Sequence, residues 1–202
     1  MITIHHLNKS RSTRVIWLLE ELNMPYNLVN HQRDPVTRLA PESLKKVHPL
    51  AKAPVIVDND LTLCESGAIV EYILDQANNE KLRPKRDSVE YYHYLEWLHF
   101  AEGSLSLPII SSLLMTMETR DGTKPLDGYI AKEIHLDFSY IESILSKRPY
   151  FAGDCFSAAD IMMTIILEMA ESLGLLKNKT TTLSYLANIK QRPAFQKAAS
   201  FG

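Results

Sequence analysis

The chain changes character near residue 77, and this change restricts the folds open to it more than any other feature of its sequence. Up to that point, short segments with alternating apolar and polar residues are interleaved with apolar residues at helical spacing. From residue 88 onward, apolar residues recur at helical spacing alone. We therefore expect a mixed α/β domain over residues 1–77 and an all-helical domain over residues 88–202. The segment 78–87 between them, NNEKLRPKRD, has no periodicity and contains a proline, which is typical of a linker.

Within the first part, the order of elements is that of a small sheet with helices. A strand, a helix and a strand fit into about thirty residues, the size of a βαβ unit. Two apolar runs separated by Asp58-Asn59-Asp60 then predict a hairpin, and a helix follows it. The expected strands are at residues 2–7, 26–31, 54–57 and 61–63, and the expected helices at 12–22, 41–47 and 66–74.

The second part is expected to be a helix bundle. Residues 88–119 form one long helical pattern, in which Pro108 predicts a kink. The helix expected over 157–173 is apolar on most faces, which is typical of a helix buried in the middle of a bundle. The other expected helices span residues 129–145, 182–191 and 193–199.

Composition excludes several classes of protein. The chain is 46% hydrophobic and 23% charged, values near the average for a globular protein. It has 22 Lys and Arg against 24 Asp and Glu, so no overall field attracts nucleic acid or an anionic membrane. Two cysteines, Cys64 and Cys155, cannot make a disulfide framework and fit a reducing compartment. Since the N-terminus lacks a signal-peptide pattern and the longest apolar stretch, near residues 161–167, is too short to span a bilayer, we expect a cytoplasmic protein.

The junction between the first strand and the first helix carries two serines. A helix N-terminus exposes unpaired N–H groups and about half a positive charge, so it favours a nearby anion, to which a serine hydroxyl can donate. Serine is also a preferred N-cap. For Ser12 we favour capping, and for Ser10 capping and ligand binding have equal weight. No Cys-x-x-Cys stands here, which disfavours dithiol chemistry.

Two further loops carry candidate binding groups. Pro54 opens a strand, and a cis bond before it would present the Ala53 backbone to a peptide-like ligand, although only about 5–6% of X–Pro bonds are cis. Glu65 and Ser66 stand where a strand becomes a helix and could hold the charged head of an amino acid, with capping by Ser66 as the alternative.

Other polar residues favour structural roles. Ser157 and Asp160 have the spacing of a capping box before an apolar run, so they are expected to start a helix. His5 and His6 are adjacent in a strand and point to opposite faces. His93 and His99 are not at the i,i+4 spacing of a zinc pair, so we expect no metal site.

Four segments together resemble the cytosolic glutathione transferases. They are SRSTRVIWLLEEL at residues 10–22, HPLAKAPV at 48–55, ESGAI at 65–69 and FSAADI at 156–161. They follow the order and spacing of that family over nearly the whole chain, and the first is most similar to bacterial and fungal members near the theta and beta classes. The resemblance implies a thioredoxin-like glutathione-binding domain at residues 1–77, an all-helical domain at 88–202 that forms much of the electrophile pocket, and a homodimer.

The resemblance also implies roles for single residues. Ser10 matches the serine that activates the thiol of glutathione, with Ser12 as the alternative. Ala53 matches the residue before a cis-proline, Pro54, whose backbone pairs with the cysteinyl part of glutathione. The remaining matches are Glu65 and Ser66 to the pair that grips the γ-glutamyl end, Lys52 to a residue near the glycyl carboxylate, and Asp160 to a structural capping aspartate.

The function implied is conjugation of glutathione, as co-substrate and without a metal, to electrophilic, mostly apolar small molecules, as in detoxification. One alternative keeps glutathione but reduces peroxides, removes halogen or isomerises its substrate. Another is a non-catalytic glutathione- or ligand-binding protein on the same scaffold, which predicts loss of the thiol-activating hydroxyl or of the binding pair. Because Ser10, Lys52, Glu65 and Ser66 are all present, an enzyme is favoured.

Overall fold

The computed structural model describes residues 1–77 and 81–202 and separates into two compact units. The first is formed by residues 1–80 and 190–202, and the second by residues 81–189. The sequence had suggested that 190–202 belong with the helical domain. These residues belong to the first unit instead, because α9 (Pro193–Ala199) packs on α1 (Thr13–Glu21). There the ring of Phe195 meets that of Trp17 edge-on at 5.0 Å.

The predicted linker, residues 78–87, falls partly outside the described residues, since 78–80 are not among them. Its remaining part is anchored in the second unit. The Leu82 side chain is only 7% exposed, and its carbonyl oxygen accepts a hydrogen bond from the Ala158 N–H at 2.8 Å.

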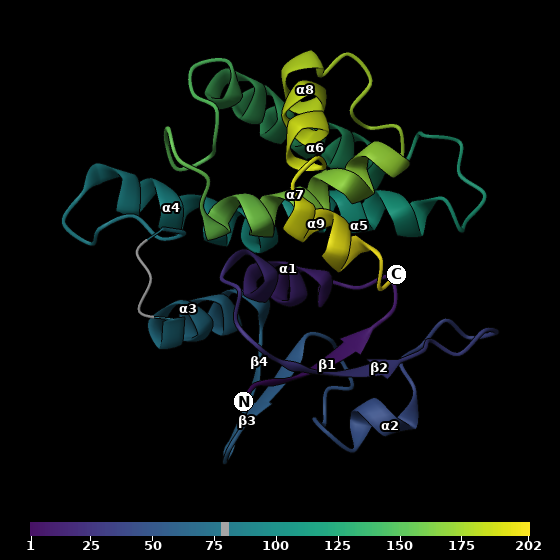
Figure 1. Cartoon of the computed structure of the whole chain (residues 1–202). Helices are drawn as coiled ribbons and strands as arrows, with labels where there is room; N and C mark the ends of the chain where they lie inside the picture. The colour runs from purple at the N-terminus through teal and green to yellow at the C-terminus, as the bar shows by residue number, and fades with distance from the viewer. Residues whose placement is uncertain (78–80) are drawn as a thin grey trace. The chain divides into compact units, whose positions relative to one another are not determined.

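A four-stranded mixed sheet forms the middle of the first unit (Figure 1). Its order is β2-β1-β3-β4, with β2 parallel to β1 and with β3 antiparallel to both of its neighbours. Helices α1 and α3 cover one face, and the short α2 lies at the other. This is the thioredoxin-like arrangement expected from the sequence, with strands at Thr3–Leu7, Asn27–His31, Val55–Asp58 and Leu61–Cys64 and helices α2 and α3 at Glu42–Lys45 and Ser66–Ala77.

Ion pairs attach the C-terminal segment to α1. The Arg192 guanidinium donates to both carboxylate oxygens of Glu21, at 2.6 and 2.8 Å. The Lys197 ammonium lies 2.8 Å from the Glu20 carboxylate. A bidentate guanidinium–carboxylate pair combines charge with fixed geometry, so it positions this segment more firmly than a single contact would.

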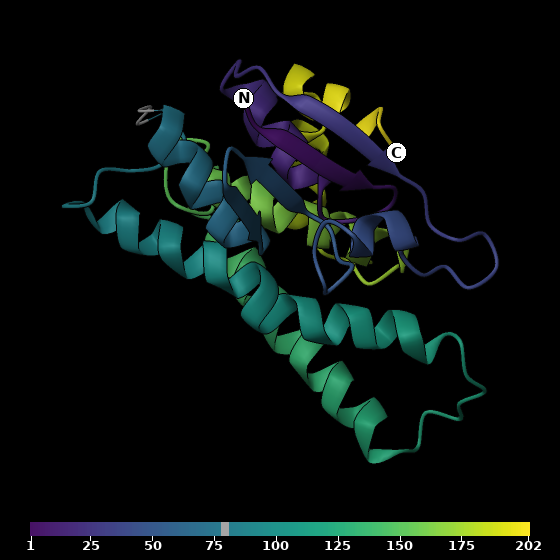
Figure 2. The ribbon, with the colours of Figure 1, turned by 90° about the horizontal axis from the view of Figure 1, so that it is seen from below.

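The second unit is helical throughout its regular structure, as predicted for residues beyond 88. Its elements are α4 (Val89–Phe100), the π-helical segment η1 (Ala101–Leu105), α5 (Ser106–Met115), α6 (Pro125–Leu145), α7 (Ala158–Ser172) and α8 (Thr180–Ile189). Helices α5 and α6 run antiparallel and side by side (Figure 2).

The irregularity expected at Pro108 lies one turn earlier, in η1. Proline has no N–H and its ring clashes with the carbonyl four residues before it, which here belongs to Ser104. That carbonyl falls within η1, and the wider π-helical turn accommodates the clash. The helix therefore continues through Pro108 into α5 instead of ending there.

The continuous helix Val89–Met115 is longer than the apolar stretch 161–167, from which we expected no membrane-spanning segment. Its 27 residues are long enough to cross a membrane, and an 18-residue window within it has a mean hydropathy of 1.3. Only 33% of that window is buried. Core helices of globular proteins have the same length and composition, so this helix does not by itself indicate a membrane span.

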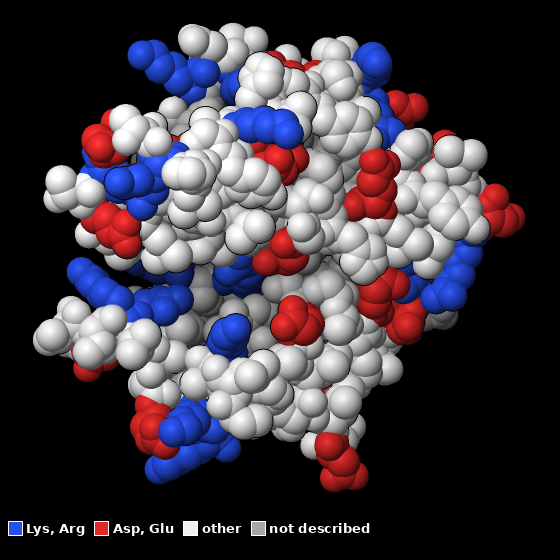
Figure 3. All heavy atoms as spheres, turned by 180° about the vertical axis from the view of Figure 1, so that it is seen from behind, with Lys and Arg blue, Asp and Glu red and all other residues white. Residues whose placement is uncertain are grey.

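Helix α7 forms the core of the second unit, as its apolar sequence predicted. Ten of its fifteen residues are buried. An aromatic cluster completes the core: the Trp97 ring lies 4.6 Å from that of Phe151 and stacks on Tyr140 at 5.1 Å, while Phe151 meets Tyr185 edge-on. At the surface, charged side chains of both signs are interspersed with uncharged surface on the face drawn in Figure 3.

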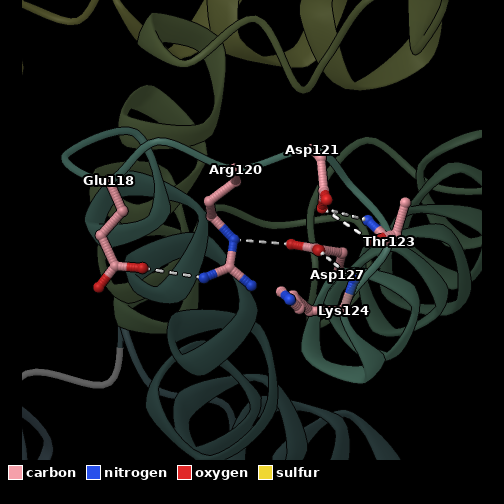
Figure 4. Close-up of polar contacts among 6 residues, drawn as sticks. All are labelled: Glu118, Arg120, Asp121, Thr123, Lys124 and Asp127. Atoms are coloured by element: carbon pink, nitrogen blue, oxygen red, sulfur yellow. Dashed lines mark hydrogen bonds and ion pairs between the residues drawn. The ribbon is translucent and has the colours of Figure 1, made fainter.

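Hydrogen bonds and ion pairs connect the residues of the loop between α5 and α6 to each other and to the start of α6 (Figure 4). The Arg120 guanidinium donates to Glu118 at 2.9 Å and to Asp127 at 2.8 Å. The other oxygen of Asp127 accepts from the Lys124 N–H at 2.8 Å, so this carboxylate also caps the helix. With Pro125 at its first position, α6 begins four residues before the expected start at 129.

The predicted capping role of Ser157 and Asp160 is present at the start of α7. One oxygen of the buried Asp160 carboxylate accepts from the N–H and hydroxyl of Ser157, at 2.9 and 3.0 Å. The other accepts from the Phe151 N–H at 3.0 Å and the Tyr185 hydroxyl at 2.9 Å. Burial, the largest effect, raises the pKa of Asp160, and these hydrogen bonds oppose the rise. One side chain therefore joins α7, α8 and the loop before α7.

We expect Asp160→Ala to lower the free energy of unfolding by at least about 3 kcal/mol, since each buried donor left unpaired costs about 1–3 kcal/mol. Urea unfolding measures the change. Asp154→Ala, at an exposed position six residues earlier, is the matched control and should change stability by less than about 0.5 kcal/mol. Equal stability of the two variants would contradict this role.

Candidate functional site

Three loops meet at one edge of the sheet in the first unit. Val55, at the start of β3, pairs with His5 of β1 on one side and with Cys64, the last residue of β4, on the other. Because β3 is antiparallel to both neighbours, its start lies at the edge where β1 and β4 end. The loop after β1, which carries Ser10, thus shares this edge with Ala53 and Glu65. Sequence spacing alone could not bring these residues together.

The N-termini of two helices point to the same edge. Helix α1 begins after the β1 loop, and α3 begins at Ser66, directly after β4. The buried Arg14 in the first turn of α1 donates to the Ser66 hydroxyl at 3.4 Å, which joins the two first turns. Each N-terminus carries about half a positive charge, and the exposed Lys52 on the third loop adds a full one. The edge therefore favours an anionic ligand.

Each of the three loops contains a non-glycine residue with a positive φ. The angles are 51° at Lys9, 49° at Ala51 and 71° at Glu65. This left-handed region is costly for residues with a Cβ, and such strain concentrates at functional sites. The sequence shows no signal for it, since a glycine would be the usual mark of such a conformation and none of these positions has one.

The two serines of the first loop differ in burial and in partners. Ser12 stands at the N-cap position but makes no side-chain cap, which corrects the expected role. Its hydroxyl is fully buried and instead accepts from the Leu7 N–H at 3.2 Å and lies 2.8 Å from His6 Nδ1. Ser10 is half-buried, accepts from the Ser12 N–H at 3.2 Å and lies 2.7 Å from the Ser12 hydroxyl. Of the two hydroxyls, only that of Ser10 belongs to a side chain with substantial exposure.

The second loop has the cis peptide bond that the resemblance implies. The Ala53–Pro54 peptide bond is cis; Pro54 is buried and Ala53 is half-buried. Glu65 is exposed, and its carbonyl oxygen accepts from the Ile69 N–H at 3.0 Å. Ser66 is therefore the first residue inside α3. Its hydroxyl accepts a hydrogen bond from Arg14 and does not cap an N–H of its own helix.

The histidines of β1 face opposite sides of the sheet, as their adjacency predicted. His5 Nδ1 lies 3.1 Å from His31 Nε2, whereas His6 contacts Ser12. Burial, the largest effect, lowers the pKa of both His5 and His31. Among residues 1–77 and 81–202, no three His, Cys, Asp or Glu side chains gather as a metal site, and Cys64 and Cys155 are half-buried and exposed, respectively. Sequence reasoning missed His6 and Arg14, whose partners are distant in the chain.

Comparisons with known proteins agree with this geometry. Residues 1–75 match the family model of the glutathione S-transferase N-terminal domain, and residues 105–197 match that of the C-terminal domain. Glutathione S-transferase 3 of Schizosaccharomyces pombe is 33% identical over 98% of this chain and 87% of its own length. Glutathione S-transferase 1 of Saccharomyces cerevisiae is 30% identical over 84% of this chain and 81% of its own.

A solved structure is similar over almost the whole length. The crystal structure of a glutathione S-transferase from Actinobacillus pleuropneumoniae superimposes with a TM-score of 0.90 at 31% identity. The alignment covers 99% of this chain and 92% of that one.

The conformation of Glu65 gives a stability test that needs no ligand. Glycine adopts a positive φ without the penalty of about 1–2 kcal/mol that a Cβ brings, but it also gains entropy in the unfolded chain. We therefore expect Glu65→Gly to be more stable than Glu65→Ala by about 0.5–1 kcal/mol in urea unfolding. Glu71→Gly against Glu71→Ala, inside α3, is the control and should have the opposite sign.

Proposed function

The chain belongs to the glutathione S-transferase family, and we propose that the edge of the sheet described above binds glutathione and holds its thiol as the thiolate. The observation that carries this proposal is the convergence of the half-buried Ser10 hydroxyl with the N-termini of α1 and α3 at one edge. A thiolate there would accept the hydrogen bond of Ser10 in a positive environment. The full burial of Ser12 supports Ser10 over Ser12 as the thiol activator.

The energies required are within reach of these groups. A free thiol titrates near about 8.5, so only about 3% is thiolate at neutral pH. Lowering this pKa by two units needs about 2.7 kcal/mol of preferential stabilisation of the thiolate. A hydrogen bond to a charged group supplies about 1.5–3 kcal/mol, and a helix N-terminus about 0.3–1 kcal/mol. One serine and one helix start are sufficient in magnitude.

The rest of the tripeptide fits the other two loops by charge and geometry. The exposed Glu65 carboxylate and the start of α3 at Ser66 suit the ammonium and carboxylate of the γ-glutamyl end. The backbone of Ala53, directly before β3, suits the cysteinyl part, which would pair with it as an added strand. Lys52 suits the glycyl carboxylate. Pro54 keeps a structural role.

We further propose that the thiolate attacks an electrophilic, mostly apolar small molecule. The sulfur forms a bond to carbon, and the leaving group departs with the electron pair of the bond that breaks. This transfer suits a role in detoxification. A homodimer in the cytoplasm is proposed on the habit of the family and on the scarcity of cysteine.

Ser10→Ala should lower kcat about tenfold to a hundredfold in an aromatic-halide assay, because it removes one charge-assisted hydrogen bond from the thiolate. The fold should remain intact by circular dichroism. Ser172→Ala, which removes an exposed hydroxyl from α7, is the control and should keep wild-type kcat. Unchanged kcat in Ser10→Ala would move thiol activation elsewhere. Peroxide and haloalkane substrates assayed in parallel separate conjugation from the other glutathione-dependent reactions.

Glu65→Gln should weaken glutathione binding about tenfold or more while changing kcat at saturation by less than about threefold. The carboxylate contacts the ammonium of the ligand equally before and during the reaction, so its loss is a loss of uniform binding. Titration calorimetry gives the Kd. Glu42→Gln, on the exposed surface of α2, serves as the control. Wild-type affinity in Glu65→Gln would contradict the placement of the γ-glutamyl end.

A further inference from the structure

His6 is a buried titratable residue to which the proposed reaction gives no role. It lies on β1, and its side chain is fully buried. Its ring is held on both sides: Nε2 lies 3.3 Å from the Phe201 carbonyl oxygen, and Nδ1 lies 2.8 Å from the Ser12 hydroxyl. The ring therefore connects the C-terminal segment to the loop that carries Ser10.

The Phe201 carbonyl determines which nitrogen of His6 carries the proton. A carbonyl oxygen only accepts, so Nε2 is the donor in this contact. Burial, the largest effect, lowers the pKa of His6; the hydrogen bond to Phe201 raises it, and the charge of His31 on β2 lowers it. Arg14, on the helix packed against β1, is engaged by Ser66. A neutral imidazole has one N–H, so Nδ1 of His6 accepts and the Ser12 hydroxyl donates to it.

The direction of the Ser12–His6 hydrogen bond determines the direction of the hydrogen bond between Ser12 and Ser10. With its single proton on His6 and not on its weaker acceptor, the Leu7 carbonyl oxygen at 3.4 Å, the Ser12 oxygen accepts from the Leu7 N–H at 3.2 Å and from the Ser10 hydroxyl at 2.7 Å. The Ser10 hydroxyl therefore donates inward, toward Ser12, while its oxygen accepts from the Ser12 N–H. In this state Ser10 has no proton left for a ligand.

Ser10 can donate outward to sulfur only if both hydrogen bonds of the series, Ser10–Ser12 and Ser12–His6, reverse their direction. Two hydroxyl oxygens 2.7 Å apart need one proton between them, so Ser12 must then donate to Ser10. Ser12 must in turn accept from His6 Nδ1, while Nε2 still donates to Phe201. An imidazole that donates from both nitrogens is the protonated imidazolium.

We propose that His6 receives the thiol proton of bound glutathione through Ser10 and Ser12. This inference rests on the proposed role of Ser10. The thiol gives its proton to the Ser10 oxygen, Ser10 passes its own to Ser12, and Ser12 passes its own to His6 Nδ1. The products are a thiolate that accepts from Ser10 and a buried imidazolium. The new negative charge on sulfur favours the charged ring and offsets the burial that lowers the pKa of His6, so no proton is released when the thiolate forms. After the sulfur has formed its bond to the electrophile, the proton returns from His6 through Ser12 and Ser10 to the leaving group or to solvent.

Proton release on binding tests the proposal directly. Wild-type protein is mixed with glutathione in weak buffer; absorbance near 240 nm counts thiolate, and a pH indicator counts protons. S-methylglutathione, which has no thiol proton, corrects for other groups. We expect close to zero protons released per thiolate formed. Release of about one proton per thiolate overturns the inference and leaves the proposed function intact, whereas absence of thiolate contradicts the proposed function itself.

Variants of the hydrogen-bonded residues identify the acceptor of the thiol proton. His6→Phe keeps a ring but has no proton acceptor, so the proton lost by the thiol can only go to solvent. Any thiolate that it forms should release about one proton each. His5→Asn, on the opposite face of β1, is the control and should behave as wild type. If His6→Phe does not fold, Ser12→Ala interrupts the same series of hydrogen bonds and should also release about one proton per thiolate.

The double variant Ser10→Ala/His6→Phe shows whether His6 acts through Ser10. If it does, the number of protons released per thiolate in the double variant equals that in Ser10→Ala, because the route is already cut. Proton release that differs between the double variant and Ser10→Ala, or release near zero in both His6→Phe and Ser12→Ala, would overturn the inference.

Discussion

The antiparallel placement of β3 between β1 and β4 is the constraint on which the first unit depends. Because Val55 pairs with both His5 and Cys64, the starts and ends of three strands meet at one edge of the sheet. Val55 and Ile56 are adjacent and point to opposite faces of the sheet, and both are buried. The pairing of Val55 with His5 places Ala53, two residues earlier, level with the end of β1.

Each unit contains a buried polar network that joins residues from different elements. Asp160 accepts four hydrogen bonds in the second unit, and His6 and Ser12 pair with each other and with the backbone in the first. A buried polar group without a partner is costly, so each network is stable only when it is complete. The two networks differ in kind. The Asp160 network joins backbone N–H groups and two hydroxyls to a carboxylate, whereas the His6 network contains an imidazole, a ring that can take up a second proton.

The C-terminal segment completes a unit that is otherwise built from the first 80 residues. Arg192 and Lys197 pair with α1, the Phe201 carbonyl accepts from His6, and the Gly202 carbonyl oxygen accepts from the Lys9 N–H at 2.9 Å. The last turn of the chain thereby contacts the same loop that carries Ser10. Residues from opposite ends of the sequence determine the environment of the proposed thiol site.

The sequence by itself determined the elements and their order. Alternation and helical spacing report burial of neighbouring residues, so the strands, the apolar α7 and the capping by Asp160 could be read from local pattern. Whether Ser12 caps its helix, which way Ser66 points and what His6 touches were decided by tertiary structure. Their partners, Leu7, Arg14 and Phe201, come from other strands, helices or the far end of the chain. Local spacing contains no record of such contacts, because they form only when the sheet brings its edges and the C-terminal segment together.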